Sequence, residues 1–451
     1  MNRRVSIAEV FDANPFSPYQ AWVSFLCFCV TFLEGFDLML IGVTMPSIAQ
    51  FLHARPGALG LAVGAGQVGP LIGNVVLGAL ADRWGRKRTL VVGAIIFGVF
   101  SAGTAYITSL QQLALFRFLA GIGLGGATPN GLAYGSEYAP TRMRATLTTT
   151  MYAGVAAGSV VAGLAGAYLL PAYGWQSLFF MGGTLPIIVG LLIAFLLPET
   201  PGFLLQRGRD KEEVRRIVSR IAPALAKEEG VEFYSAEEKL PGVPVKHLFL
   251  EGRAFITIML WLLFFACFVV MWFLLGWAPT LLKKAGATVQ QFSIAFACVN
   301  IGSVIAILLT GRLMDKTNPF NLLKAAFILS CISLVAFGLF STSQFIVIAI
   351  VCVIAGFFVF AGNAGLMALA TLLYPLDIRS SGIGCACAAG KVGSVVALAM
   401  GGFLLAHNWS TIQICNLNGL IALIVAGLLV VLHRHVKRSA KSADAARAAA
   451  N

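Results

Sequence analysis

The chain has 451 residues, of which 58% are hydrophobic and only 11% are charged, and its formal net charge is +13. A soluble globular protein carries about 25% charged residues, so the composition excludes an ordinary soluble domain and indicates helices that face lipid or one another. The basic residues lie in short stretches between apolar runs. We therefore expect no continuous basic surface, and no binding of nucleic acid.

The N-terminal segment MNRRVSIAEVFDANPFSPYQ is polar and contains no cleavable apolar region. We therefore expect no signal peptide and a cytoplasmic N-terminus. The nine cysteines lie inside apolar runs, and none has the spacing of metal ligands in a loop. Small polarizable residues of this kind serve mainly in packing, so the sequence predicts neither a metal site nor a cofactor.

Apolar stretches long enough to cross a bilayer, which takes about 20 residues, occur along the whole chain. The expected spans run from Ala21 to Met45, Gly57 to Leu80, Leu90 to Ile107, Leu110 to Ala133, Ala145 to Leu170, Ser177 to Leu197, Ala254 to Leu282, Phe292 to Leu313, Leu322 to Phe340, Phe345 to Leu373, Gly382 to Leu405 and Thr411 to Leu432. The sequence therefore predicts an all-α membrane protein with twelve transmembrane helices.

The charges of the loops predict how these helices are oriented. Alternate loops hold most of the basic residues, among them Arg83, Arg86, Lys87, Arg88, Arg142, Arg144, Arg312, Lys316 and Arg379. The opposite loops hold little more than Arg55, Lys283 and Lys284. Because basic loops stay in the cytoplasm, we expect a multi-pass protein of the bacterial inner membrane with both termini cytoplasmic.

A polar segment at 198–253 interrupts the apolar pattern. Its stretch RGRDKEEVRRIVSRIAPALAKEE alternates in charge and has apolar residues at helical spacing, which predicts a cytoplasmic linker with a short helix. The linker separates an N-terminal six-helix half, 1–197, from a C-terminal six-helix half, 254–432. A basic cytoplasmic tail follows at 433–451.

An internal repeat supports two related halves. The sequence GSVVA occurs at Gly158–Ala162 and again at Gly393–Ala397, and the same offset relates Arg144 to Arg379. Parallel repeats of six spans are a known transporter architecture, in which the substrate site lies near the bilayer midplane between the repeats. We expect two pseudo-symmetric halves with that arrangement.

Two loop and helix motifs carry a resemblance to a known superfamily. GALADRWGRKR, Gly78–Arg88, lies in the loop after the second expected span, and RFLAGIGLGG, Arg117–Gly126, lies in the fourth. TGRLMDKTNP, from Thr310, looks like a weaker second copy of the first motif. These motifs resemble the signatures of the major facilitator superfamily along the whole chain. The resemblance implies the major facilitator fold and a transporter that acts as a monomer.

Further motifs resemble one family of that superfamily, the aromatic acid:proton symporters. They are EGFD (Glu34–Asp37), GLGGATPNGLAYGSEYAP (Gly123–Pro140), GWQSLFFMGG (Gly174–Gly183), LPET (Leu197–Thr200) and YPLDIRSSGIG (Tyr374–Gly384). The resemblance implies proton-coupled uptake of a small aromatic carboxylate, such as benzoate, hydroxybenzoate, gentisate or a phenylpropanoate, by alternating access. The chain departs from the family at Lys391, where members tend to carry an arginine, so its substrate choice can differ.

Four charges inside the expected spans are the main site candidates, because a charged residue at the centre of a membrane helix costs about 2.5–3.5 kcal/mol on insertion scales. Glu34 and Asp37 share one face of the first span, and Asp37 lies roughly 24 Å along it. We interpret Asp37 as the proton carrier and Glu34 as its modulator. The alternative for Asp37 is a purely structural ion pair with Arg117 of the same half.

The two basic candidates have a structural alternative as well. Arg117 lies near the outer end of its span and can extend its side chain to the interface, whereas Lys391 lies roughly 14 Å from the inner end, where this is harder. We expect both to bind the substrate carboxylate or to act as counter-ions.

Weaker candidates complete the prediction. Substrate contacts are assigned to the amides Gln67, Asn130, Asn300 and Asn363 and to the aromatic residues Phe36, Tyr152 and Trp272. Each of these residue types serves more often in hydrogen bonds between helices or in lipid contact. Gating ion pairs at the cytoplasmic helix ends are assigned to Asp82, Arg86, Glu137, Arg144, Asp315 and Arg379.

Other functions remain open at this point. LPETPGFL, Leu197–Leu204, resembles a sugar-porter signature, but buried Arg117 and Lys391 suit an organic anion better. A drug/proton antiporter would typically show Gly-Pro in the fifth span, where this chain has Gly158 followed by Ser159. A membrane sensor would carry a signalling domain. An enzyme is not expected, because no nucleophile–base pair or metal cluster appears.

Overall fold

The computed structural model describes residues 3–206, 211–226, 228, 231–234, 248–250, 253–374 and 379–450. The chain forms two compact units. Unit 1 comprises Met1–Leu40, Ala65–Ala165 and Ala172–Pro241, and unit 2 comprises Ile41–Gly64, Gly166–Pro171 and Gly242–Asn451. The chain passes from one unit to the other within helices α2 (Pro18–Phe51), α3 (Pro56–Gly66) and α7 (Arg144–Leu196), and again in the polar segment.

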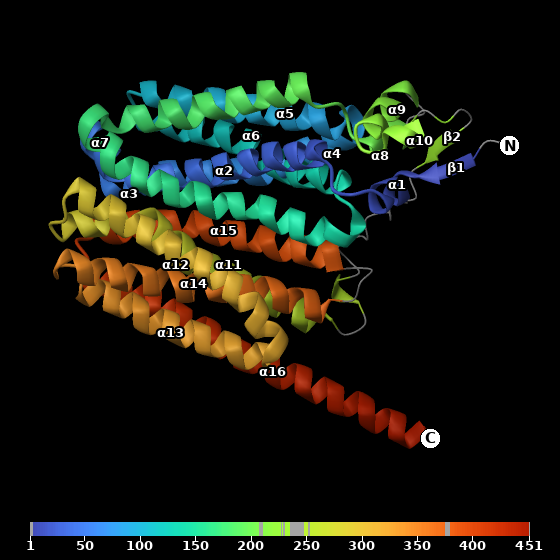
Figure 1. The fold of residues 1–451 in the computed structure, drawn as a ribbon. Helices are drawn as coiled ribbons and strands as arrows, with labels where there is room; N and C mark the ends of the chain where they lie inside the picture. The colour runs from blue at the N-terminus through green and yellow to red at the C-terminus, as the bar shows by residue number, and fades with distance from the viewer. Residues whose placement is uncertain are drawn as a thin grey trace. The chain divides into compact units, whose positions relative to one another are not determined.

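Long helices dominate unit 1, as Figure 1 shows. They are α2 (Pro18–Phe51), α4 (Val68–Trp84), α5 (Arg86–Gly103), α6 (Leu110–Glu137) and α7 (Arg144–Leu196). The short elements are β1 (Arg3–Ser6), α1 (Ile7–Ala13), η1 (Thr104–Tyr106), η2 (Thr141–Met143), α8 (Pro201–Gln206), α9 (Lys211–Ser219), α10 (Pro223–Ala226) and β2 (Val231–Tyr234).

All the regular secondary structure in the described residues of unit 2 is helical. They are α3 (Pro56–Gly66), α11 (Ala254–Lys284), α12 (Val289–Lys316), α13 (Pro319–Leu339), α14 (Phe345–Leu373), α15 (Arg379–Ala406) and α16 (Thr411–Ala450), with the last turns of α2. Glycines bring these helices close together. A Cβ at Gly302 of α12 would overlap the carbonyl oxygen of Val353 in α14, and one at Gly356 would overlap that of Val299. Small residues permit such backbone contact between membrane helices.

The long helices among the described residues form twelve membrane spans. Ten candidates are long and apolar enough to cross a membrane. One of them contains α7, whose 53 residues would extend roughly 80 Å, far more than the ~30 Å of a hydrocarbon core. Gly174, with φ 76° and ψ 171°, divides it into two helices, which a residue without a Cβ does at little cost. The remaining span is α6, in which Arg117 and the many glycines lower the mean hydropathy. The predicted all-α fold with twelve transmembrane helices is confirmed.

The second expected span is interrupted at Gln67, between α3 and α4. Pro70 explains the interruption, because proline has no N–H to donate to the carbonyl group four residues earlier, that of Gly66. The same stretch packs tightly on α6. A Cβ at Gly73 would overlap the carbonyl oxygen of Ile122, and a Cβ at Gly66 would lie 2.9 Å from the Cβ of Arg117. The interruption therefore lies directly against the buried arginine.

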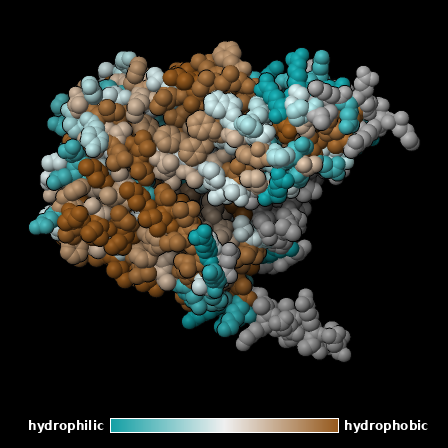
Figure 2. Space-filling model, viewed as in Figure 1, coloured by the Kyte–Doolittle hydropathy of each residue, from teal (hydrophilic) through white to brown (hydrophobic). Residues whose placement is uncertain are grey.

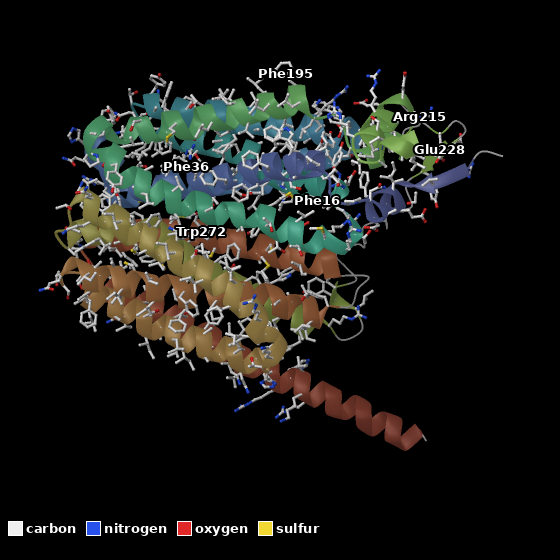
Figure 3. All side chains as sticks on the ribbon, viewed as in Figure 1. Phe16, Phe36, Phe195, Arg215, Glu228 and Trp272 are labelled. Atoms are coloured by element: carbon white, nitrogen blue, oxygen red, sulfur yellow. The ribbon has the colours of Figure 1, made fainter. Side chains whose placement is uncertain are left out.

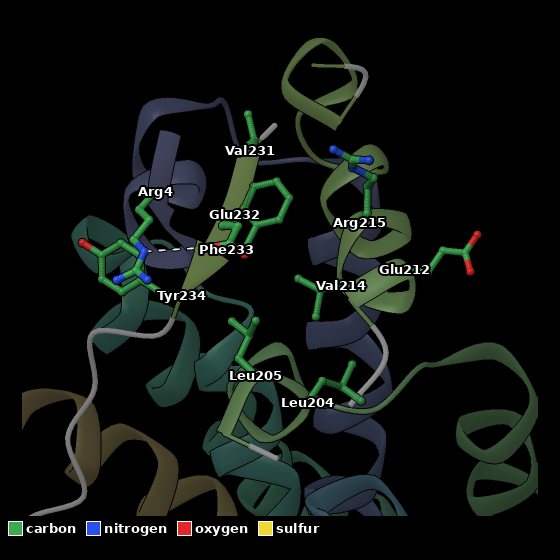
Figure 4. Close-up of a pocket in the computed structure, with 10 residues that line it drawn as sticks. All are labelled: Arg4, Leu204, Leu205, Glu212, Val214, Arg215, Val231, Glu232, Phe233 and Tyr234. Carbon is green, nitrogen blue, oxygen red and sulfur yellow. Dashed lines mark ion pairs between the residues drawn. The ribbon is translucent and has the colours of Figure 1, made fainter. Parts of the chain in front are cut away.

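A small polar subdomain lies at one end of unit 1, around α8 and α9. In the segment where the sequence predicts a short helix, α9 buries Val214, Ile217 and Val218. Strand β1 pairs in parallel with β2, with Arg3 opposite Val231. This sheet was not predicted, because two four-residue strands far apart in the sequence show no recognisable period. A cavity of about 580 Å³ lies between β2, α8 and α9, next to an ion pair of 3.7 Å between Arg4 and Glu232 (Figure 4).

Hydrogen bonds attach the N-terminal segment to the loop after α6. The backbone N–H of Thr141 donates to Asp12 Oδ1 over 2.6 Å, and the Thr141 hydroxyl donates to Asp12 Oδ2. These bonds, the hydroxyl first, hold the pKa of Asp12 below its ordinary value. Figure 2 shows hydrophobic residues over the flanks of the long helices and hydrophilic ones gathered around α8 and α9, as expected where helices leave the bilayer.

Candidate functional site

A buried ion pair joins α2 to α6 in unit 1. Arg117 Nη1 lies 2.9 Å from Asp37 Oδ2 and 3.1 Å from Oδ1. Asp37 is 5% exposed and Arg117 8% exposed, so water does not screen the attraction between them. A third helix takes part, because the Ser101 hydroxyl of α5 donates to Asp37 Oδ1 over 2.6 Å. The structure thus brings together two of the three buried charges that the sequence singles out in this half, Asp37 and Arg117.

Close helix contacts position the two partners. A Cβ at Gly35 of α2 would overlap the carbonyl group of Val155 in α7, and one at Gly158 would overlap that of Phe32. These contacts fix α2 beside α7 and leave Asp37 facing α5 and α6. Glu34, one turn earlier on α2, is half-buried.

Two nitrogen atoms of the Arg117 guanidinium are not used by Asp37. Its Nε and Nη2 are buried and, within the described part of the chain, have no hydrogen-bond partner. The Phe179 ring lies 5.1 Å from its Cζ atom, which gives the guanidinium an aromatic neighbour but accepts no conventional hydrogen bond. A buried donor without an acceptor costs about 1–3 kcal/mol and more if charged. A carboxylate is the anion that best matches such a fork, through two parallel N–H···O bonds.

Gln67 lies next to this region in the chain. It occupies the break between α3 and α4, immediately after Gly66, which contacts Arg117. Gln67 is 7% exposed, and its Oε1 has no partner among the described residues. An amide oxygen accepts hydrogen bonds, so Gln67 offers an acceptor beside the cation.

Unit 2 places its own cation differently. Lys391 of α15 is half-buried, and its Nζ lies 5.9 Å from the centre of the Trp272 ring in α11. Within the described residues of the chain, this ammonium forms no hydrogen bond or ion pair. Trp272 is 4% exposed, and its indole Nε1 has no acceptor among those residues. The pair therefore presents a cation and an unused donor inside a membrane unit.

The predicted amides are mostly engaged. Asn130 donates to the Gly126 carbonyl oxygen over 2.7 Å, and Asn300 donates to that of Phe296 over 2.9 Å. Both acceptors lie one turn earlier in the same helix, so these side chains do not connect different helices through these bonds. Asn363 directs its amide to Cys267 Sγ at 3.8 Å, which joins α14 to α11.

The other two aromatic candidates differ in their exposure. Phe36 is 1% exposed and packs against Gly182 of α7, so the core of unit 1 encloses it. Tyr152 is 53% exposed on α7. The substrate roles of both residues remain predictions.

Two of the residues that the sequence assigns to gating form an ion pair with each other in unit 1, although this pairing was not predicted and their gating role remains a prediction. Arg86 Nε lies 2.7 Å from Glu137 Oε1, which links the start of α5 to the end of α6. Arg144, at the start of α7, is half-buried. The side chains of Asp82, Asp315 and Arg379 lie outside the described residues, so their expected ion pairs remain predictions.

Three functional-looking residues were missed in the sequence. Ser101 is a single serine in an apolar run, and Phe179 is one of 33 phenylalanines, so neither carried a signal. Glu199 was quoted only as part of a motif. Its Oε1 accepts from the backbone N–H of Lys87 at 3.0 Å, at the N-terminus of α5. A carboxylate at that position satisfies a free N–H and complements the helix dipole.

Comparison with known proteins fixes the family. The model of the Major Facilitator Superfamily matches residues 27–384 and 260–450. The chain belongs to the major facilitator superfamily. It is therefore a membrane transporter and not an enzyme, as the motifs indicate.

Curated relatives cover nearly the whole chain. The 4-hydroxybenzoate transporter PcaK of Acinetobacter baylyi is 35% identical over 91% of this chain and 90% of its own length. The gallate transporter of Pseudomonas putida is 30% identical over 97% of both chains. The resemblance to aromatic acid transporters is thereby confirmed. Among solved structures, the inward-open xylose transporter XylE from E. coli superposes with a TM-score of 0.73 at 19% identity, covering 91% of this chain and 96% of its own, which supports the fold alone.

Proposed function

We propose that this chain takes up a small aromatic carboxylate together with a proton, by alternating access across the bacterial inner membrane, with both termini cytoplasmic. The observation that carries the proposal is that the Arg117 guanidinium has hydrogen-bond donors left over after it pairs with Asp37. Asp37 engages only Nη1, while Nε and Nη2 are buried without a partner among the described residues. Relatives named as carriers of 4-hydroxybenzoate, gallate and benzoate support an aromatic acid as the substrate class.

The geometry supports a role for each member of the ion pair. A substrate carboxylate that binds Nε and Nη2 adds a second negative charge to one guanidinium. Asp37 then shares its counter-charge with the substrate and becomes the group that accepts a proton, because two carboxylates beside one cation repel each other. Ser101 remains hydrogen-bonded to either form, since a hydroxyl donates to a carboxylate and accepts from a carboxylic acid.

The same charges account for the coupling. With substrate and proton bound, the negative charge of the substrate balances Arg117, and the protonated Asp37 is neutral. A monoanion that moves with one proton transfers no net charge, whereas each net charge moved through 100 mV exchanges about 2.3 kcal/mol with the membrane potential. Accumulation by a one-proton cycle therefore depends on the pH gradient.

Unit 2 contains a second group of residues that suit an aromatic acid. The Lys391 ammonium offers a point charge, and the Trp272 ring offers an apolar face and an N–H donor. Both suit a ring that carries a carboxylate or hydroxyl group. We assign Lys391 and Trp272 to substrate selection, and Arg117 with Asp37 to carboxylate binding and proton coupling.

Uptake into proteoliposomes tests the proposal. Full-length protein is reconstituted at neutral internal pH, and radiolabelled 4-hydroxybenzoate is added at acidic external pH with and without a protonophore. We expect accumulation that the protonophore abolishes. Asp37→Asn is expected to lose acid-driven accumulation while it retains exchange of labelled for unlabelled substrate, because the amide still accepts from Arg117.

Glu34→Gln is the matched control, since it removes the neighbouring carboxylate of the same helix. It is expected to alter the rate and to leave accumulation coupled to the pH gradient. Unchanged acid-driven accumulation in Asp37→Asn would refute the assigned proton carrier. Transport of xylose but of no aromatic acid would refute the substrate class.

A further inference from the structure

A polar groove of about 430 Å³ lies in unit 1 where α9 meets the start of α5 and the end of α7. Three basic side chains line it: Lys87 from α5, and Arg216 and Arg220 from α9 and the turn that follows. Glu212 and Glu213 line it as well. The transport site proposed above lies in the membrane helices and involves none of these residues.

Within the described residues, the basic side chains of the groove have no ion-pair partner. No ion pair within 4.0 Å joins Lys87, Arg216 or Arg220 to any described carboxylate, including those of Glu212 and Glu213. The guanidinium of Arg220 lies over the Tyr19 ring at 4.9 Å, which fixes its place without neutralising its charge. Among the described residues that line the groove, three cations face two carboxylates, and this excess of one positive charge complements a monoanion.

The apolar edge of the groove faces lipid. Phe195, in the last turn of α7, also lines the groove and is 84% exposed, and the neighbouring Leu196 is 47% exposed. Figure 3 shows Phe195 pointing away from the helices of its unit. Because α7 spans the membrane, such exposed apolar residues contact acyl chains. The groove therefore begins where the hydrocarbon ends, at the depth of the lipid headgroups.

We propose that this groove binds the headgroup of an anionic phospholipid of the phosphatidylglycerol type. Lys87, Arg216 and Arg220 bind the phosphate, and the acyl chains lie along Phe195. Glu212 and Glu213 accept hydrogen bonds from the headgroup hydroxyls, which a glycerol headgroup supplies and a choline headgroup lacks. Basic pockets beside membrane helices on the cytoplasmic side are suited to anionic headgroups in general. The continuity of the charged groove with a lipid-facing surface favours a membrane lipid over a free phosphate.

Such a lipid would connect three segments. It would link the first turn of α5, the last turn of α7 and the short helix α9. The bound lipid would thus attach the polar segment to the membrane helices. Transport activity is then expected to depend on the lipid composition of the bilayer as well as on substrate.

Lipid binding to the full-length protein in detergent tests the proposal. Affinities for dioleoyl phosphatidylglycerol, phosphatidylethanolamine and phosphatidylcholine, which share their acyl chains, are measured by native mass spectrometry during titration. We expect phosphatidylglycerol to bind most tightly. The double variant Lys87→Gln/Arg216→Gln is expected to weaken its binding about 30-fold, since each basic residue near anionic lipid contributes about 1 kcal/mol and two are removed.

The matched control is Arg83→Gln/Arg88→Gln, which removes two exposed charges from the same stretch of chain without touching the groove. It is expected to keep its affinity within about twofold of the parent protein. Equal losses in the two double variants, or equal affinity for the three lipids, would overturn the site. Displacement by glycerol phosphate at the same concentration would show a free phosphate site and overturn the lipid assignment. Thermal unfolding without lipid checks that all variants are folded.

Discussion

Each unit places a cation among its membrane helices, and the two units surround it differently. In unit 1, Arg117 is fully buried and paired with Asp37, which Ser101 also contacts. In unit 2, Lys391 is half-buried beside the Trp272 ring and, within the described residues, has no acid to pair with. The carboxylate beside Arg117 can take up a proton when a ligand carboxylate binds the same cation. The indole beside Lys391 cannot take up a proton, so that cation can only bind a ligand. This difference is why we assign proton coupling to unit 1 and substrate selection to unit 2.

The framework around the two cations is nevertheless shared. Gly158 approaches the Phe32 carbonyl group of α2, and Gly393 approaches the Phe265 carbonyl group of α11. The serine after each glycine bonds within its own helix, Ser159 to Val155 O at 2.7 Å and Ser394 to Lys391 O at 2.6 Å. The repeated GSVVA therefore marks the same close contact in both units. The two units differ instead in the side chains that surround their cations.

The largest effect is expected for Arg117→Lys, which keeps the charge and removes the fork. Lysine can pair with Asp37 but cannot also offer two parallel donors to a carboxylate. We expect uptake of 4-hydroxybenzoate to fall by about 10- to 100-fold, the range for a lost hydrogen bond to a charged group. Initial rates in proteoliposomes measure it. Near-normal uptake would show that Arg117 serves only as the counter-ion of Asp37.

A smaller effect is expected at Lys391. Lys391→Met removes the charge at similar length, and we expect the KM for aromatic carboxylates to rise about tenfold with proton coupling retained. Lys391→Arg is the matched control, because it restores the residue typical of the resembling family and keeps the charge. Uptake at a series of substrate concentrations separates KM from maximal rate. Loss of coupling in Lys391→Met would contradict the division between the units.

The smallest effect is expected for Trp272→Phe. This change keeps an aromatic face beside Lys391 and removes the indole N–H, so only substrates that accept a hydrogen bond from it should respond. We expect the KM to rise about three- to fivefold for 4-hydroxybenzoate, the worth of one neutral hydrogen bond, and to change little for benzoate. Equal shifts for both substrates would place the ring hydroxyl elsewhere.

Much of the fold follows from hydrophobic length alone. The spans are visible because a bilayer demands long apolar helices, and α6 is recognisable despite Arg117 because its motif supplements its weak hydropathy. Asp37 and Arg117 stand out as site residues for the same reason, since a charge is conspicuous in an apolar run. Their direct contact was foreseen only as an alternative, because the sequence shows depth but not which helix faces which.

Other features have no local signal. Ser101 is identified only by its contact with Asp37 from another helix, and the unused acceptor of Gln67 depends on the break between α3 and α4. The amides Asn130 and Asn300 look like substrate ligands in sequence, yet both donate to their own helix. The sequence does not show which acceptor an amide side chain uses, because that depends on which carbonyl oxygens lie within reach in the folded chain.

The break at Gln67 has a mechanical consequence. A continuous helix resists bending because each turn must give up hydrogen bonds, but Pro70 has already removed one at this point. The angle between α3 and α4 can therefore change at low cost, and Gly66 transmits that change to the backbone of α6 beside Arg117. Binding of an anion to the Arg117 guanidinium would then be coupled to bending of this span, because the hinge lies directly beside the binding site.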